Sequence, residues 1–207
     1  MPKKIIKYSL TIIIVAFVAY NSVYFKKLSD VKAAAKATFD PVNYARNYLD
    51  KPLLNAAGKA PEADALINLL KSSPAKAFKT DAHALNIGNT RFFMVQGQGV
   101  IASIDENDVY LITDGKQPLK IATEYIFGNA LRDAPGVITV NDFTNSMDLN
   151  NVSAEINKLV RSEILPPFKS KAKKGDRIVF AGAFELNQEH INLANMEIIP
   201  VLLTIKN

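Results

Sequence analysis

The sequence predicts an α+β protein, an OB-like Greek-key β-barrel with a small helical subdomain and an N-terminal transmembrane or signal helix. Three observations predict this class. An uncharged apolar run opens the chain, an alanine-rich stretch with helical periodicity follows, and beyond residue 87 about three strands, one helix and two strands come in turn. We therefore expect a signal anchor at 1–28, a helical subdomain at 29–86 and an OB-like β-barrel domain at 87–207.

The N-terminus has the pattern of an export signal. Lys3, Lys4 and Lys7 precede an uncharged run from Tyr8 to Phe25, whose 18 residues would span about 27 Å as a helix, close to the hydrocarbon thickness of a bilayer. Because no small-x-small cleavage site directly follows this run, we expect an uncleaved anchor, with cleavage as the alternative. The lysines favour a cytoplasmic N-terminus. This predicts a single-pass protein of the inner (cytoplasmic) membrane with its body in the periplasm.

Composition and charge exclude several classes of protein. The chain has no cysteine, which excludes disulfides, thiolate zinc sites and cysteine nucleophiles. Residues 1–32 carry six lysines and one aspartate, whereas the other 175 residues carry 19 basic and 19 acidic side chains. Binding to a phosphate backbone needs a dense cationic face, so we expect no nucleic-acid partner. We interpret the lysines of residues 169–175 as a solvated helix end.

The stretch between residues 29 and 86 carries three helix signals. Asp40 and Pro41 combine a capping residue with a proline at the first helical position. A second helix is predicted within residues 62–71, where apolar residues recur at helical spacing. A third helix opens at Ser73 and ends near His83.

The remaining sequence alternates between strands, turns and one helix. Strands are predicted at 91–104, 109–113, 119–127, 177–186 and 196–205, and a further extended piece at 135–140. The helix begins before Val152, keeps one apolar face to Ile164, and ends at Pro166 and Pro167. The helix between the third and fourth barrel strands is typical of an OB fold, and a generic α+β sandwich is the alternative.

One motif carries a resemblance to a known family. The stretch 124–134 reads EYIFGNALRDA, and a second element and a helical asparagine follow it. The matching residues are Gly128, Asn129, Ala130, Arg132, Asp133, Asp142, Phe143, Asn145 and Asn157. With the segments 39–44 and 175–186, they resemble the bacterial predicted periplasmic lipoproteins of the domain of unknown function 2291, over about residues 24–205.

The resemblance implies an exported, membrane-tethered protein with an OB-like barrel and a helical subdomain. It brings no established activity. Members of the family are often encoded beside sugar uptake systems, which is an association only. The cysteine that accepts a lipid in this family is absent here, and residues 22–24 (Ser-Val-Tyr) occupy its region. The apolar N-terminal helix would therefore have to attach the protein to the inner membrane.

The motif also supplies the candidate ligand-binding residues. These are Gly128, Asn129, Arg132, Asp133, Asp142, Asn145 and Asn157. Arg132 presents a rigid fork that suits a carboxylate or a pair of sugar hydroxyls, and Gly128 lets backbone amides approach a ligand. The structural alternative is that Gly128 bends a strand at a barrel corner, Arg132 pairs with a nearby acid, and Asp133 and the asparagines cap turns.

No motif for catalysis, a metal or a cofactor is recognised. The acidic residues at 105–108 lack the later Gly and Glu of a calcium loop and read as a hairpin turn. His83 and His190 are the only histidines and lie far apart in sequence. We therefore expect no cofactor, no metal and no assigned catalytic residue, and these absences favour a protein that is not an enzyme.

Three functions remain open at this point. The first is a binding or accessory module for a small polar molecule or an envelope protein partner, in connection with sugar uptake. The second is a cofactor-free periplasmic hydrolase or lyase that uses Glu124 or Asp133 as acid or base, which requires a cleft beside that carboxylate. The third is a scaffold subunit of an envelope complex, which requires a large exposed apolar patch.

Overall fold

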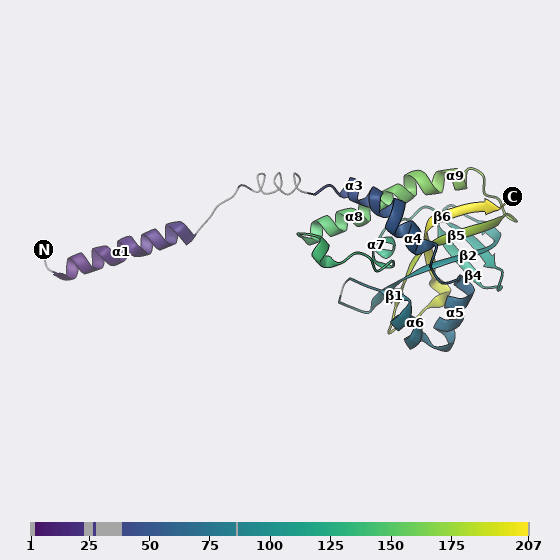
Figure 1. Cartoon of the computed structure of the whole chain (residues 1–207), viewed down its shortest axis with the longest axis horizontal. Coiled ribbons are helices and arrows are strands. Elements are labelled where there is room, and N and C mark those ends of the chain that lie inside the picture. The colour runs from purple at the N-terminus through teal and green to yellow at the C-terminus, as the bar shows by residue number, and fades with distance from the viewer. Residues whose placement is uncertain (1–2, 23–26, 28–38, 86, 207) are drawn as a thin grey trace. The chain divides into compact units, whose positions relative to one another are not determined.

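The computed structural model describes residues 3–22, 27, 39–85 and 87–206 (Figure 1). The chain divides into two compact units, residues 1–40 and residues 41–207, which are described separately.

The first unit contains the helix α1, Lys3–Ser22. Its uncharged part runs from Tyr8 to Ser22, and these 15 residues span about 22 Å, less than the hydrocarbon thickness of about 30 Å. Among the residues that the structure describes, no helix is long and apolar enough to cross a membrane. This finding does not support the predicted transmembrane helix. The end of the predicted run, residues 23–25, lies outside the described residues.

The second unit begins with a series of short helices. They are α3 (Pro41–Tyr48), the π-helical turn η1 (Leu49–Leu53), α4 (Leu54–Ala57), α5 (Ala63–Ser72) and α6 (Pro74–Thr80). Three of them begin where the sequence signals place them, at residues 41, 63 and 74. Pro41 and Pro74 each lack an amide hydrogen that the first turn of a helix leaves unbonded in any case, so proline is tolerated at these positions.

Six strands form one sheet in this unit. They are β1 (Ala82–His83), β2 (Thr90–Ile104), β3 (Asp108–Thr113), β4 (Pro118–Ala122), β5 (Arg177–Asn187) and β6 (Glu197–Lys206). Their order is β1-β2-β3-β4-β6-β5, and β5 also pairs with β2, so the pairings return to β2. All pairs are antiparallel except β4–β6, which is parallel. The predicted α+β class is confirmed.

The chain between β4 and the long helix differs from the prediction. The predicted strand 119–127 ends at Ala122, and the predicted extended piece 135–140 is a turn followed by the 3₁₀ helix η2, Val140–Asp142. The four-residue helix α7, Ala130–Asp133, lies between them. Gly128 has a φ of +84°, which turns the chain out of the extended path and starts this compact segment.

The long helical segment also continues further than predicted. It consists of α8 (Ser146–Leu159), the π-helical turn η3 (Val160–Ile164) and α9 (Leu165–Lys169). Pro166 and Pro167 do not end the helix, because they occupy the first turn of α9. Asn145 caps α8, since its side-chain oxygen accepts a hydrogen bond from the amide of Asp148 at 2.9 Å.

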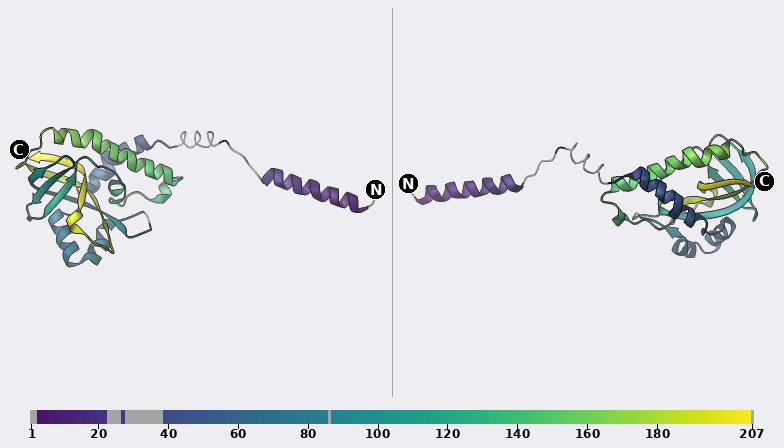
Figure 2. Two further views of the ribbon diagram at one scale, coloured as in Figure 1. Left: turned by 180° about the vertical axis from the view of Figure 1, so that it is seen from behind. Right: turned by 45° about the horizontal axis from the view of Figure 1, so that its top comes forward.

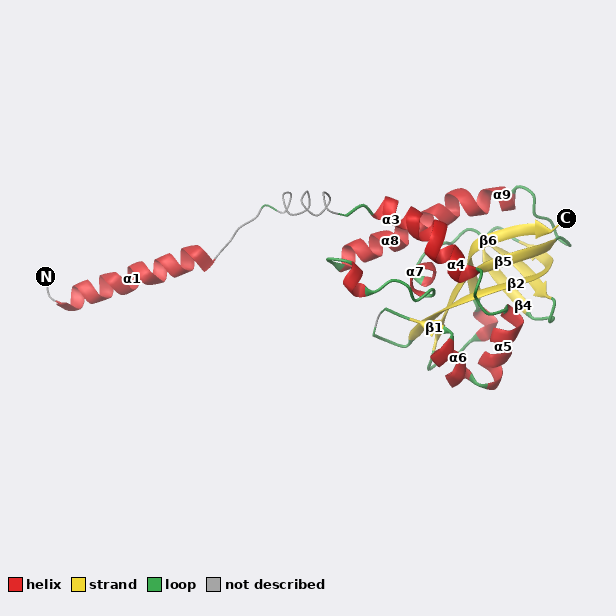
Figure 3. Ribbon diagram, viewed as in Figure 1, coloured by secondary structure: helices red, strands yellow, loops and turns green. Residues whose placement is uncertain are grey.

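Helices cover the strands from two sides. The segment α8–α9 and α3 lie together on one side, and α5 and α6 lie on the other (Figures 2 and 3). Residues of α5 and α6 share one buried cluster with residues of β2 to β6 and α9. At its centre Phe93 of β2 stacks on Phe184 of β5 at a centroid distance of 5.2 Å, and Phe78 meets Phe93 edge-on at 5.1 Å. The helices of residues 63–80 and the sheet therefore share one core.

Candidate functional site

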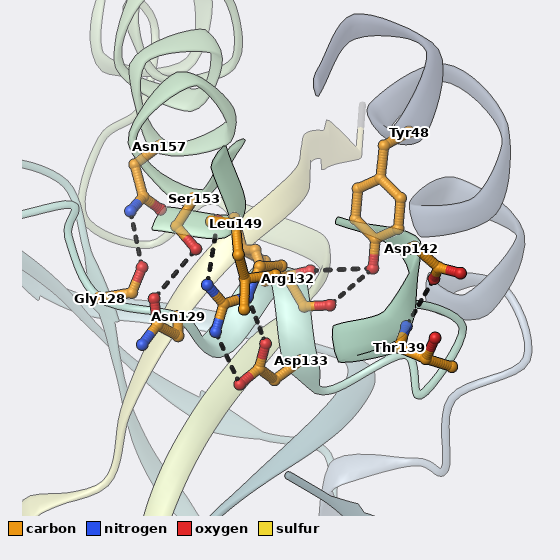
Figure 4. A network of polar contacts seen from close by, with 11 residues as sticks. Tyr48, Gly128, Asn129, Arg132, Asp133, Thr139, Asp142, Leu149, Ser153 and Asn157 are labelled. Carbon is orange, nitrogen blue, oxygen red and sulfur yellow. Dashed lines mark hydrogen bonds and ion pairs between the residues drawn. The ribbon is translucent and has the colours of Figure 1, made fainter. Parts of the chain in front are cut away.

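The motif at 128–133 forms a buried polar network (Figure 4). Arg132 Nε lies 2.5 Å from Asp133 Oδ1, and Arg132 Nη2 lies 3.1 Å from Asp133 Oδ2. The two side chains are 1% and 0% exposed. This two-point geometry satisfies both charged groups inside the protein, which an isolated buried charge does not achieve.

Hydrogen bonds of Arg132 connect the helices α7, α8 and α3. Arg132 Nη1 donates to the backbone oxygen of Leu149 in α8 at 3.1 Å, and the Tyr48 hydroxyl in α3 donates to the backbone oxygen of Arg132 at 2.8 Å. Burial, and next the Asp133 carboxylate, raise the pKa of Tyr48, so its hydroxyl stays protonated as a donor. Among the described residues, no buried side-chain nitrogen or oxygen lacks a hydrogen-bond partner. The network is saturated by the protein itself.

The turn before α7 is held by α8. Asn157 Nδ2 donates to the backbone oxygen of Gly128 at 2.9 Å, and Ser153 Oγ donates to Asn129 Oδ1 at 2.9 Å. Asn157 is buried, as its place beside the apolar face of the helix would suggest. These bonds fix the chain where it leaves the sheet.

Asp142 and Asn145 lie outside this network. Asp142 Oδ2 accepts from the amide of Thr139 at 2.7 Å, and the two residues form a capping box around η2. Asn145 caps α8. Both are exposed, and each orders its own turn.

The structure thus brings five of the seven predicted residues together and places two at helix caps. Gly128, Asn129, Arg132, Asp133 and Asn157 meet where α7 contacts α8. Contact of these residues with a ligand stays a prediction. What the structure shows is that Arg132 and Asp133 connect helices and have no open face.

The acid–base hypothesis needs a cleft beside Glu124 or Asp133. Both oxygens of Asp133 are bonded to Arg132, and its side chain is fully buried. Glu124 is exposed and forms an ion pair with Lys169 at 3.0 Å. Neither residue has the free, partly buried geometry that a general acid or base requires.

A cavity of about 340 Å³ lies directly beside Gly128. It is bounded by the 125–130 segment, the end of β5, the β5–β6 connection and the start of β6. Its lining residues are Tyr125, Phe127, Gly128, Ala130, Phe184, Glu185, Leu186, Asn187, His190, Asn192, Glu197 and Ile199. Its volume falls within the range of about 300–1,000 Å³ that is usual for small-molecule sites.

Aromatic and polar side chains share this cavity. Tyr125 and Phe127 are 62% and 68% exposed, which is unusual for large apolar side chains beside a cavity unless they form its rim. Of the seven candidate ligand-binding residues predicted from the sequence, only Gly128 lines this cavity. The sequence contains one pattern that could have indicated the cavity. Polar residues lie at the ends of the last two predicted strands, namely Glu185, Asn187 and Glu197.

A cluster of three charged side chains adjoins the cavity at Glu197. Lys120 Nζ in β4 lies 3.1 Å from Glu197 Oε1 and 3.6 Å from Asp108 Oδ2 in β3. Burial, and next a hydrogen bond with Glu197, raise the pKa of Asp108 to about 6, although Lys120 opposes the shift. Among the described residues, no group of three His, Asp or Glu side chains is placed to hold a metal ion.

The raised pKa of Asp108 predicts a pH dependence of stability. A carboxyl group whose pKa is higher in the folded than in the unfolded state stabilises the fold at low pH, and this contribution is lost as the pH rises through the folded pKa. For Asp108 the loss is expected between about pH 4 and about pH 6. We expect Asp108→Asn to remove about 1–2 kcal/mol of this pH dependence, measured as unfolding free energies at several pH values. Equal pH profiles for the two proteins would contradict the assignment.

Comparison with solved structures identifies a similar fold. A crystal structure of an OB-fold protein from Thermotoga maritima matches 81% of this chain and 99% of that one, with a TM-score of 0.72 and 27% sequence identity. This likeness supports an OB-type fold for the body, whose strands are ordered β2-β3-β4-β6-β5 with a return of the pairings to β2. The comparison with curated proteins finds no match.

The family comparison covers nearly the whole chain. A family model described as "Predicted periplasmic lipoprotein (DUF2291)" matches residues 13–204. This confirms the resemblance read from the 128–145 motif, and its description fits an extracytoplasmic, membrane-associated location. The chain belongs to the DUF2291 family of predicted periplasmic lipoproteins.

Proposed function

We propose that this protein is an extracytoplasmic binding module that holds a small polar molecule in the cavity beside Gly128. The observation that carries the proposal is the lining of that cavity. Exposed aromatic rings at Tyr125 and Phe127 face the same space as the polar side chains of Glu185, Asn187 and His190. Such a combination, an apolar wall with a few polar groups that fix orientation, is typical of sites for small molecules.

The buried network supports this role by making the cavity rigid. Gly128 belongs to both the network and the cavity, because its backbone oxygen is bonded to Asn157 while the residue lines the space. The aromatic rim therefore starts from a chain segment that α8 holds in place. A site formed in advance loses less entropy when it binds a ligand.

The proposal extends to attachment and context. We propose that the body is an OB-like barrel kept at the inner membrane by the N-terminal segment, as an accessory to sugar uptake. The basic residues before an apolar run, the lack of cysteine and the family description support this reading. Release of the full-length protein from membranes by alkaline carbonate would contradict the attachment.

Binding can be tested with the purified full-length protein and the variant Phe127→Ala. We expect at least one member of a panel of sugars, amino acids and small amines to raise the melting temperature, since a ligand at 100 times its Kd adds about 2.7 kcal/mol to stability. Removing the exposed ring at 127 is expected to lower the affinity for that ligand about tenfold, because a well-placed aromatic contact contributes on the order of 1 kcal/mol.

A matched control separates binding from folding. Tyr110 is also a partly exposed aromatic residue, but it lies on β3 and does not line the cavity. Tyr110→Ala is expected to leave the affinity unchanged. If no compound binds, or if binding is the same in Phe127→Ala, the cavity is not the binding site and the proposal is wrong.

A further inference from the structure

Two carboxylates stand on neighbouring strands at the wall of the cavity. In the β5–β6 ladder Ala183 pairs with Ile199. The pairing of the two strands ends there. Glu185 lies two residues further along β5 and Glu197 two residues earlier on β6, so both stand at the same end of this strand pair, and both line the cavity. Two negative charges at the wall of one cavity repel each other unless a cation compensates them.

The protein compensates only one of these two charges. Glu197 pairs with Lys120, but that lysine also serves Asp108. Glu185 forms no ion pair with any residue in the part of the chain that the structure describes, and no Lys or Arg is among the cavity's lining residues. Asp108 and Glu197 thus share the ammonium group of Lys120, and Glu185 has no cationic partner among the described residues.

The state of Asp108 is a separate sign of the same imbalance. Burial, and next a hydrogen bond with Glu197, raise the pKa of its carboxyl group to about 6. A cation bound near Glu197 would add to the single positive charge that Lys120 supplies there. The cavity borders Glu197, so a ligand bound there is in position to supply that cation.

We propose that the cavity binds an organic cation, with an ammonium group at Glu185 and Glu197 and its apolar part against Tyr125 and Phe127. The inference rests on the proposed function and names the ligand class of the same site. Aromatic faces attract cations through their quadrupole, so both kinds of wall favour the same ligand. Anionic ligands, such as sugar phosphates, are disfavoured by the excess of carboxylates.

The test compares probes that differ in charge. Choline and its uncharged tert-butyl analogue have nearly the same shape, and spermidine, glucose and glucose phosphate extend the panel to a polyamine, a neutral polyol and an anion. Binding is measured by titration calorimetry on the full-length protein. We expect choline or spermidine to bind, the uncharged analogue to bind about tenfold more weakly than choline, and glucose phosphate not to bind.

Two isosteric variants assign the effect to the cavity. Glu185→Gln removes one charge and keeps the side-chain shape, and it is expected to weaken cation binding about tenfold. Glu155→Gln makes the same charge change on α8, outside the cavity, and is expected to leave the affinity unchanged.

Each outcome decides the matter. Cation binding that is insensitive to Glu185, or equal affinity for choline and its uncharged analogue, overturns the proposal. Phe127-dependent binding of glucose without cation binding overturns the ligand class but leaves the proposed function standing. If none of the probes binds, here or in the wider panel, both are overturned.

Discussion

Arg132→Met is expected to lower the free energy of unfolding by about 3–5 kcal/mol, because it leaves the buried carboxylate of Asp133 without its partner. The variant also loses the hydrogen bond from Arg132 to the backbone oxygen of Leu149, so the contact between α7 and α8 loosens as well. Equilibrium denaturation with urea, monitored by circular dichroism, measures the effect.

The double variant Arg132→Met with Asp133→Leu is the informative control. Replacing both members of a buried pair by apolar residues of similar size is often neutral or stabilising, so we expect most of the loss to be recovered. If the double variant is as unstable as Arg132→Met, the ion pair is not the cause. A loss below about 1 kcal/mol for the single variant would mean that water reaches Asp133.

Phe93→Ala is expected to destabilise the fold by about 3–5 kcal/mol, through lost burial and the cavity left behind. Phe93 is 0% exposed and lies between Phe78 and Phe184. Because Phe184 also lines the proposed ligand cavity, the variant is expected to bind ligand more weakly even under conditions where it remains folded.

Phe127→Ala makes the same chemical change at an exposed ring and serves as the control for stability. Its unfolding free energy is expected to stay within about 0.5 kcal/mol of the parent, as is usual for surface substitutions. Comparable losses in Phe93→Ala and Phe127→Ala would contradict the assignment of core and rim. Thermal and urea denaturation of both variants gives the comparison.

Sequence patterns predicted the regular elements well where one face of the element is buried. The strands at 91–104, 109–113, 177–186 and 196–205 correspond to β2, β3, β5 and β6, because alternation and β-branched residues are local properties of the chain. The prediction of a strand at 119–127 was wrong beyond Ala122. Its apolar residues Tyr125 and Phe127 are exposed at the cavity rim and not packed in a strand, and a periodicity argument cannot distinguish these two cases.

The candidate site shows a different limit of prediction from sequence. A polar motif in an apolar run predicts either a site or a saturated network, and only the contacts with Leu149, Tyr48 and Asn157 show the network here. Those partners lie 16 or more positions away in sequence, so no local pattern contains them. The cavity residues Glu185 and Glu197 come from β5 and β6, and they reach one cavity only because these two strands pair as neighbours, which the local sequence of either strand does not show.

The return of the strand pairings to β2 has a consequence for association between molecules. Each of β2, β3, β4, β5 and β6 has neighbours on both sides along part of its length, so these strands offer few unpaired backbone groups to another chain. Where β6 runs past its short contact with β4, η3 and α9 pack against it, and Pro200 removes one donor. Edge-to-edge association through these five strands is thereby disfavoured, and a partner protein that meets them finds mainly side chains, because little of their backbone is available for strand addition.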